Sequence, residues 1–486
     1  MPRMDTVASF LADPVNYWYW WVVAALLLIA GIAFGVMTGA VQIRLIPEMF
    51  RTVKETPGED ADSNQISAFK AFTISAASRV GTGNVAGVAV AITTGGPGAV
   101  FWMWLIAILG GATAFVESTL AQLWKERDTE NRAYRGGPAY YMTKGLNARW
   151  LAVLFGIAIT LTYGFVYNAV QTNSIVEAFS VSFGSDAMST RLIIGAVIAA
   201  VTAVVIFGGI QRIANVTQVI VPFMAGAYII IGAVVVAMNI SAVPDMISLI
   251  VGHALGFREV TGATLGVAIQ QGIRRGLFSN EAGQGSAPNA AATASVSHPV
   301  KQGLVQTLGV YFDTLVVCSI TAFIILLSHP SFGEGVESSA LTQRALASEV
   351  GAWGTHAITF ILFFLAFSSV IGNYYLAQSN IEYFTRNRGV LAGFRVLVVL
   401  CVFAGAVGTV PLVWNLADTF AATMVVLNLI AIIPLSRVAV RLLRNYMEQR
   451  REGKDPVFHR SMMPDIPNVE CWGPADPEIR EGVRPS

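Results

Sequence analysis

Eleven apolar runs recur along this chain of 486 residues, and each can cross a hydrocarbon layer ~30 Å thick as a helix rising ~1.5 Å per residue. The two-residue alternation of a transmembrane strand does not recur, which excludes a transmembrane barrel. The sequence therefore predicts an all-α membrane protein with about 11 transmembrane helices. These are expected at roughly residues 17–39, 66–94, 97–123, 150–180, 190–208, 213–239, 261–293, 302–327, 354–384, 391–410 and 413–434.

Composition supports this class and excludes others. Only 13% of the residues are charged, against ~25% in soluble domains, while 54% are hydrophobic. A net charge of +1 provides no field that would attract nucleic acid. The three cysteines, Cys318, Cys401 and Cys471, are too few for a disulfide framework and are expected to be buried thiols.

The charges between the runs predict the orientation of the chain. Lysine and arginine gather in alternate loops, and such loops lie on the cytoplasmic side. The N-terminus is therefore predicted outside and the C-terminus inside. The basic loops hold Arg44, Arg51 and Lys54, then Lys125, Arg127, Arg132, Arg135, Lys144 and Arg149, then Arg212, Lys301, Arg386, Arg388 and the cations of 437–454; the opposite side has Arg3, Arg191, Arg258 and Arg344.

Three segments outside the runs have their own character. Residues 132–148 are predicted to form a short amphipathic cytoplasmic helix. Residues 331–350 are predicted to form an external cap with a helix near Leu341 to Ala347. The tail from residue 452 is rich in Pro, Glu and Arg, has little to bury and is expected to be flexible.

The second and seventh runs contain residues that interrupt a helix near its midpoint. Gly81-Thr82-Gly83-Asn84 lies in the second run, and a Gly-, Asn- and Ser-rich stretch ending at Pro288 lies in the seventh. With the first run set aside, these helices open two groups of five, and because five is odd the second group is inverted. The predicted divisions are an N-terminal helix and loop (1–64), two repeats (65–240 and 241–435) and a basic, then flexible, tail (436–486).

An interrupted membrane helix leaves amides at one half-helix end and carbonyls at the other, and lipid satisfies neither. A zwitterionic amino acid fits such a gap, because its carboxylate meets the amides and its ammonium meets the carbonyls. A bare cation can take the remaining oxygens. The alternative is that the glycines only allow close helix packing.

Four stretches of sequence carry a family resemblance: VGTGNVAGVA (80–89), GGPGAVFWMW (95–104), RGLFSNEAG (275–283) and GSAPNAAAT (285–293). Over about residues 65–435 the chain resembles the alanine or glycine:cation symporters, also called sodium:alanine symporters. The resemblance implies the five-plus-five inverted-repeat fold of the bacterial leucine transporter with one extra N-terminal helix. It also implies sodium- or proton-driven uptake of small neutral amino acids across a prokaryotic inner membrane.

The same resemblance implies substrate contacts at both breaks. Thr82, Gly83 and Asn84 match the substrate-contacting break of the first core helix, and Gln171 matches a position of the third. Gln171 offers a donor and an acceptor to a zwitterion, although a Gln can also bond a neighbouring helix.

At the second break, Phe278 is placed like an aromatic lid over the substrate, and packing is the competing role. Ser279 and Asn280 supply either ligand oxygens or helix caps.

Ser368 and Ser369 resemble the paired hydroxyls that this fold offers to sodium. The carbonyls opposite them are expected in the segment from Ala77 to Gly81, with Ala77 and Val80 as ligands. A serine that bonds its own helix backbone is the competing interpretation. Sodium is thus the expected coupling ion, and no organic cofactor is expected.

Asn373 marks a departure from the family pattern, which commonly has Trp just after the hydroxyl pair. An amide in place of an indole makes the pocket larger and more polar. We hypothesise that a longer polar substrate such as glutamine is accepted alongside or instead of alanine and glycine. Gln284 and Gly111 are further departures, and the sequence assigns them no role.

Ionisable residues within the runs need partners, because an isolated charge in the bilayer costs a few kcal/mol. Arg79 or Arg275 is expected to pair with Glu281 at a gate, and for Arg274 and Arg275 the alternative is snorkelling toward the cytoplasmic interface. Asp313 is expected to be a hydrogen-bonded structural acid, with proton coupling as the alternative.

Two other function classes find little support. The five histidines lie far apart and no nucleophile motif occurs, which argues against an enzyme. No repeated filter or charge ring suggests a channel. The expected function is sodium-coupled uptake of a small neutral amino acid, with proton coupling in the same fold as the alternative. The expected partners are the amino acid, sodium and the bilayer, and no nucleic acid; the oligomeric state is left open.

Overall fold

The computed structural model describes residues 9–55, 66–128, 133–258, 264–332 and 340–473. Arg3 and Arg132, two cations of the orientation argument, lie outside these residues, as do 333–339 of the predicted cap and the last residues of the tail. Within the described residues, nine helices are long and apolar enough to cross a membrane. Two further predicted spans are the interrupted ones, so the all-α membrane class is confirmed.

The N-terminal part precedes the repeat. A single π-helical turn, η1 (Leu11–Asn16), leads into the apolar helix α2 (Tyr17–Met37). Two short helices, α3 (Val41–Arg44) and α4 (Ile46–Val53), follow at the end where α2 finishes.

The first group of five spans begins with the interrupted helix. Its parts are α5 (Ala68–Arg79), η2 (Gly83–Gly87) and α6 (Val88–Gly95). The remaining spans are α7 (Gly98–Leu123), the pair α9 (Arg149–Leu161) and α10 (Tyr167–Phe183) joined by η3 (Thr162–Val166), α11 (Met188–Ile206) and α12 (Gly209–Met238).

The second group repeats this order. Its interrupted helix is α14 (Leu265–Asn280) and α15 (Ala287–Ala291). Next come α16 (Pro299–Val310) and α17 (Ser319–Leu327) joined by η5 (Tyr311–Cys318), then α19 (Trp353–Phe384), α20 (Arg388–Gly405) and α21 (Val410–Arg451).

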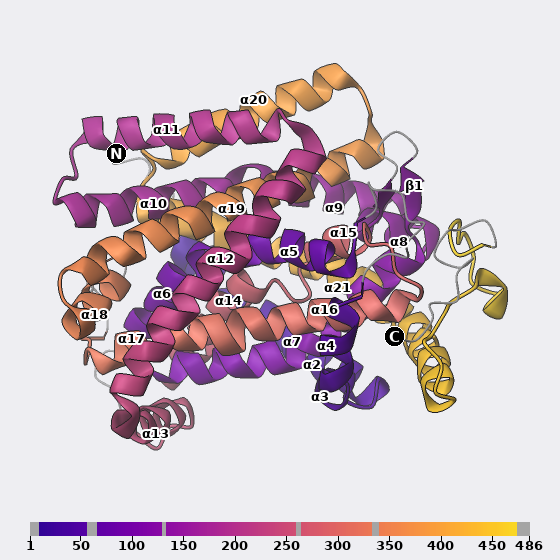
Figure 1. Cartoon of the computed structure of the whole chain (residues 1–486), viewed down its shortest axis with the longest axis horizontal. Helices are drawn as coiled ribbons and strands as arrows, with labels where there is room; N and C mark the ends of the chain where they lie inside the picture. The colour runs from indigo at the N-terminus through magenta and orange to yellow at the C-terminus, as the bar shows by residue number, and fades with distance from the viewer. Residues whose placement is uncertain (1–8, 56–65, 129–132, 259–263, 333–339, 474–486) are drawn as a thin grey trace.

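The long helices run roughly side by side and enclose the interrupted ones (Figure 1). α11 and α20 pack together at one edge, while α2 and α7 lie toward the opposite edge. α7 packs against α14 and α16, and α10 packs against α19, so both breaks are surrounded by other helices. A polar gap in either helix is thereby removed from lipid.

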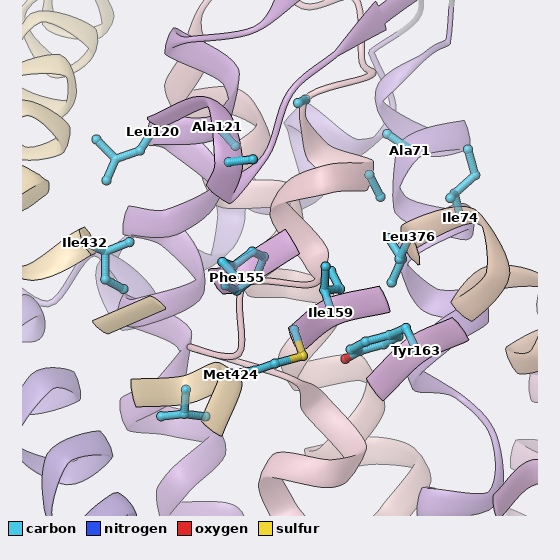
Figure 2. Close-up of a cluster of buried hydrophobic side chains, with 14 of the residues drawn as sticks. Ala71, Ile74, Leu120, Ala121, Phe155, Ile159, Tyr163, Leu376, Met424 and Ile432 are labelled. Atoms are coloured by element: carbon cyan, nitrogen blue, oxygen red, sulfur yellow. The ribbon is translucent and has the colours of Figure 1, made fainter. Parts of the chain in front are cut away.

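Apolar side chains from distant parts of the chain fill the space between these helices (Figure 2). Phe155 and Ile159 of α9 lie near Met424 of α21 in a buried cluster that also includes Leu120 of α7. Their complete burial and the packing of α9 on α21 position α9, and so position the second part of that span, which carries Gln171.

Several connections differ from the prediction. Residues 132–148 hold more than a helix, since β1 (Glu126–Asp128) and β2 (Ala133–Arg135) form an antiparallel hairpin before α8 (Pro138–Lys144). The cap helix is found as α18 (Leu341–Val350). The pair η4 (Ile240–Ala242) and α13 (Val243–Ala254) was not predicted, and it lies at the end of the molecule that carries α18.

The expectation of a tail with little to bury is wrong for residues 452–473. α21 continues to Arg451, beyond the predicted span, and the tail then turns back through η6 (Arg460–Met462). Phe458 and Trp472 of this segment are buried against the other helices. Of the three free cysteines, Cys318 and Cys471 are buried as expected, and Cys401 is partly exposed.

Candidate functional site

The first break opens after Arg79. Val80 leaves helical geometry with ψ of 89°, and the chain becomes helical again at Gly83. Two amides freed by this opening find side-chain acceptors: Gly81 N donates to Asn84 Oδ1 at 2.9 Å, and Thr82 N donates to Gln171 Oε1 at 3.1 Å. Two of the predicted site residues, Asn84 and Gln171, therefore satisfy the amides that the break exposes.

Close packing explains why glycine occupies position 81. A Cβ on Gly81 would lie 2.1 Å from Ser369 Oγ, which is far inside van der Waals contact. This short distance also shows that the Ser369 hydroxyl lies directly against the break. α19 and the first interrupted helix thus meet at this point.

The second break begins at Glu281, which has a left-handed φ of 58°. Gly283 and Gly285 also have positive φ, so the sequence uses glycine where the turn requires it. Ala282 N donates to Asn280 Oδ1 at 3.0 Å, and Gly283 N donates to Glu117 Oε1 at 3.1 Å. Asn280 is the last residue of α14, so its side chain supports the turn that follows and does not cap a helix. Glu117 of α7 supports the break from outside.

A buried polar cluster joins the two breaks. Asn84 Nδ2 donates to Ser279 Oγ at 3.0 Å and to Asp313 Oδ1 at 2.7 Å. Ser279 Oγ donates to Asp313 Oδ2 at 2.6 Å, and Thr314 Oγ1 donates to the same oxygen at 2.9 Å. Asp313 is fully buried in η5 and bonds residues of both interrupted helices, as expected for a hydrogen-bonded structural acid.

Aromatic rings cover one side of the breaks. Phe278 lies between Tyr167 and Trp414, with ring centroids 4.8 and 5.0 Å away. A Cβ on Gly83 would lie 3.1 Å from the Phe278 ring, so this ring faces the first break. Phe278 is thus both packed and adjacent to the opened backbone.

Gln284, to which the sequence assigned no role, links two aromatic side chains. Its Nε2 donates to Tyr167 Oη at 2.8 Å, and its Oε1 accepts from Tyr163 Oη at 3.2 Å.

Close packing explains the glycine at position 111, to which the sequence also assigned no role. A Cβ there would lie 3.1 Å from Tyr311 Oη.

Asn373 is fully buried, yet neither its Oδ1 nor its Nδ2 has a hydrogen-bond partner among the described residues. Thr82 Oγ1 and Asn168 Oδ1 are also buried without a hydrogen-bond partner among these residues. The adjacent Gly372 lies so close to α5 that a Cβ would meet Ser78 N at 2.8 Å. Buried amide and hydroxyl groups without partners carry a desolvation cost that a polar ligand would remove.

The two candidate sodium hydroxyls bond their own helix. Ser368 Oγ and Ser369 Oγ both donate to Leu365 O, at 2.8 and 3.0 Å. Bonding to the helix backbone is the alternative to sodium binding that the sequence left open. These two hydrogen bonds use only the hydroxyl protons. The oxygen lone pairs stay available, and α19 contacts α5 so closely that a Cβ on Gly372 would lie 3.1 Å from the carbonyl carbon of Ala77.

Arg79 and Glu281, the residues expected to pair at a gate, have other hydrogen-bond partners in this structure. The Arg79 guanidinium donates to the backbone carbonyl of Gln306 at 3.4 Å and to the side-chain Oε1 of Gln306 at 3.3 Å. Glu281 instead accepts from Ser286 at 2.6 Å and from Ser78 at 3.2 Å. Within the described residues, no ion pair joins Glu281 to an arginine.

Arg275 pairs with Asp418 of α21, a partner that the sequence reasoning missed. Arg274 contacts the same carboxylate at 3.3 Å, and both guanidiniums are buried, so neither snorkels. Each also lies over an indole ring, Arg274 over Trp20 and Arg275 over Trp414. A lone acid within an apolar run was the available signal for Asp418.

Comparison with known proteins shows which family has this sequence pattern. Residues 4–460 match the model of the sodium:alanine symporter family. The chain is 48% identical to the amino-acid carrier protein AlsT of Bacillus subtilis over 96% of this chain and 98% of that protein. It is 47% identical to the probable sodium/glutamine symporter GlnT of Bacillus subtilis, over 93% of each protein.

An archaeal relative and a solved structure extend the comparison. The sodium/alanine symporter AgcS of Methanococcus maripaludis is 38% identical over 92% of this chain and 99% of its own length. The crystal structure of MhsT in complex with L-phenylalanine has a TM-score of 0.55 at 13% identity, covering 79% of this chain and 99% of that one. The likeness to MhsT concerns the fold alone, and it agrees with the predicted leucine transporter-like inverted repeat.

Proposed function

This chain belongs to the sodium:alanine symporter family, and we propose that it couples sodium entry to the uptake of a small neutral amino acid by alternating access. The observation that carries the proposal is the polar cluster of Asn84, Ser279 and Asp313, which ties the two interrupted helices to each other. Any ligand that enters one break therefore acts on both repeats.

The amino acid is proposed to bind at the breaks, with its carboxylate near the amides of Gly81 and Thr82. These amides already donate to the side-chain oxygens of Asn84 and Gln171, and a substrate carboxylate would replace these neutral acceptors with a charged one. The released Gln171 and Asn84 amides can then bond the substrate. Phe278 closes the apolar side.

Sodium is proposed to bind where Ser368 and Ser369 face the end of α5. The Ser369 oxygen lies against Gly81, and the carbonyls of Ala77 and Val80 end the same half-helix. An ion there steadies the opened backbone that also contacts the amino acid. Each ligand then raises the affinity for the other by the same factor.

The remaining features of the proposal follow from the family and the charge pattern. The protein is proposed to sit in a prokaryotic inner membrane with its N-terminus outside, to move its substrate unchanged rather than act as an enzyme, and to need no organic cofactor. Alanine, glycine and glutamine are the proposed substrates, since relatives are named as alanine and glutamine symporters. Proton coupling is the alternative.

Uptake into proteoliposomes tests the proposal. Radiolabelled alanine, glycine and glutamine are compared under an inward sodium gradient and under choline at constant pH, with sodium-dependent accumulation expected. Ser369→Ala should raise the sodium concentration for half-maximal uptake about tenfold, as the loss of one polar ligand would. Ser379→Ala is the matched control, because Ser379 of the same helix also bonds its own backbone but lies away from the break. Equal uptake in choline would refute sodium coupling.

A further inference from the structure

A polar cavity of about 480 Å³ lies beside α8, between the start of α9 and the end of α19. Three arginines line it, Arg135, Arg149 and Arg386, together with the acids Glu126 and Glu382. It therefore lies at the end of the molecule where the hairpin is found, the end assigned to the cytoplasm by charge (Figure 1).

The charges of this cavity do not cancel locally. Glu126 pairs with Lys144 at 2.7 Å, whereas Glu382 accepts a hydrogen bond from the neutral Gln378 and keeps its charge. Arg135 faces Asp128 at 3.8 Å. Within the described parts of the chain, Arg149 and Arg386 have neither an ion pair nor a side-chain hydrogen bond. Three guanidiniums therefore line the cavity against two carboxylates, one of which is paired with Lys144, so the cavity keeps an excess of positive charge that attracts an anion.

An apolar groove of about 300 Å³ continues from the polar cavity. Phe384 and Thr385 line both, so the two spaces meet at the end of α19. The groove then runs along α9 and is lined by Val153, Ile157 and Leu161. These side chains are on the outer surface of a membrane-spanning helix, with Ile157 54% exposed, so they are accessible to lipid acyl chains.

The boundary between the two spaces has the composition of a membrane interface. Trp150 follows Arg149 and is 62% exposed, and Phe384 is 43% exposed. Exposed aromatic rings collect at the level of lipid headgroups. The arginines therefore lie at headgroup depth and the groove lies at acyl-chain depth.

We propose that the two spaces together form a binding site for one phospholipid with an anionic headgroup from the cytoplasmic leaflet. Arg149 and Arg386 bind its phosphate, and one acyl chain occupies the groove along α9. A soluble anion would fill only the polar half and leave the groove without a role. This site is separate from the breaks, so the proposal is independent of the transported substrate.

Native mass spectrometry of the full-length protein tests this site. The detergent-solubilised protein is titrated with phosphatidylglycerol and phosphatidylcholine that carry the same dioleoyl chains. Preferential binding of phosphatidylglycerol is expected, and Arg149→Gln and Arg386→Gln should each weaken it about fivefold. The control is Arg388→Gln, since Arg388 is exposed two residues further on and does not line the cavity.

The occupant is identified by two further arms. Glycerol 3-phosphate supplies the headgroup anion without chains, and dihexanoyl phosphatidylglycerol supplies short ones; both are expected to compete poorly with the dioleoyl lipid. Competition by glycerol 3-phosphate at the same concentration would overturn the lipid assignment in favour of a soluble anion. An equal loss in Arg388→Gln, or no preference for phosphatidylglycerol, would overturn the site itself. Unchanged gel-filtration profiles keep a folding defect separate from a binding defect.

Discussion

Asn373 is the residue at which side-chain chemistry most directly bears on substrate choice. Its side-chain amide is buried without a hydrogen-bond partner in the part of the chain that the structure describes, on the helix that also presents Ser369 to the first break. A buried amide of this kind favours a substrate that brings its own donor and acceptor. Glutamine has such a group in its side chain, whereas alanine does not.

We therefore predict that Asn373→Trp lowers glutamine uptake at least about tenfold more than alanine uptake, because an indole both fills the space and removes the amide. Initial rates for the two substrates in the same proteoliposomes give this ratio. Asn373→Ala removes the amide without adding bulk and should weaken glutamine uptake alone. A uniform loss for both substrates in the two variants would contradict the hypothesis.

The interrupted helices show how much of an element can be anticipated from sequence. Their breaks were predicted because Gly, Asn, Ser and Pro act locally on the backbone. Their supports were not predictable, since Arg275 and Asp418 are 143 residues apart and Glu117 reaches Gly283 across 166 residues. Such partners depend on which helices pack together, and periodicity within a helix does not contain that information.

Glycine at the first break gives a prediction about the element. Gly81→Ala should abolish uptake, because its Cβ would lie 2.1 Å from Ser369 Oγ and push α19 away from the break. Gly87→Ala is the matched control on the same interrupted helix, where the nearest atom outside it would be 3.8 Å away. Uptake and melting temperature of both variants are measured. Full activity of Gly81→Ala would mean that the break tolerates a separation from α19.

In the whole molecule, the C-terminal tail connects α7 with the segment before α16. Trp472 Nε1 donates to Gln122 O of α7 at 3.2 Å, and Phe458 N donates to Ser297 O, which follows the second break, at 2.8 Å. Asp455 meets Lys301 of α16 at 2.8 Å. Beside this pair, burial raises the pKa of Glu55, although Lys301 opposes the change.

The composition of the tail gave no sign of this packing. Its apolar residues are few and separated, and their burial depends on a surface made by helices more than 100 residues away. The tail therefore fixes the C-terminal end of α7 and the N-terminal end of α16 relative to each other. Any state in which these ends separate must break the contacts of Trp472 and Asp455.

Trp472 tests whether the tail is part of the folded transporter. Trp472→Ala removes a fully buried indole, and truncations of this kind cost about 3–5 kcal/mol in a core. We expect a lower melting temperature of the purified protein in detergent. Met462→Ala should leave it nearly unchanged, because Met462 belongs to the same tail but is 49% exposed. Equal melting temperatures for the wild type and both variants would show that the tail packs without stabilising the helices it covers.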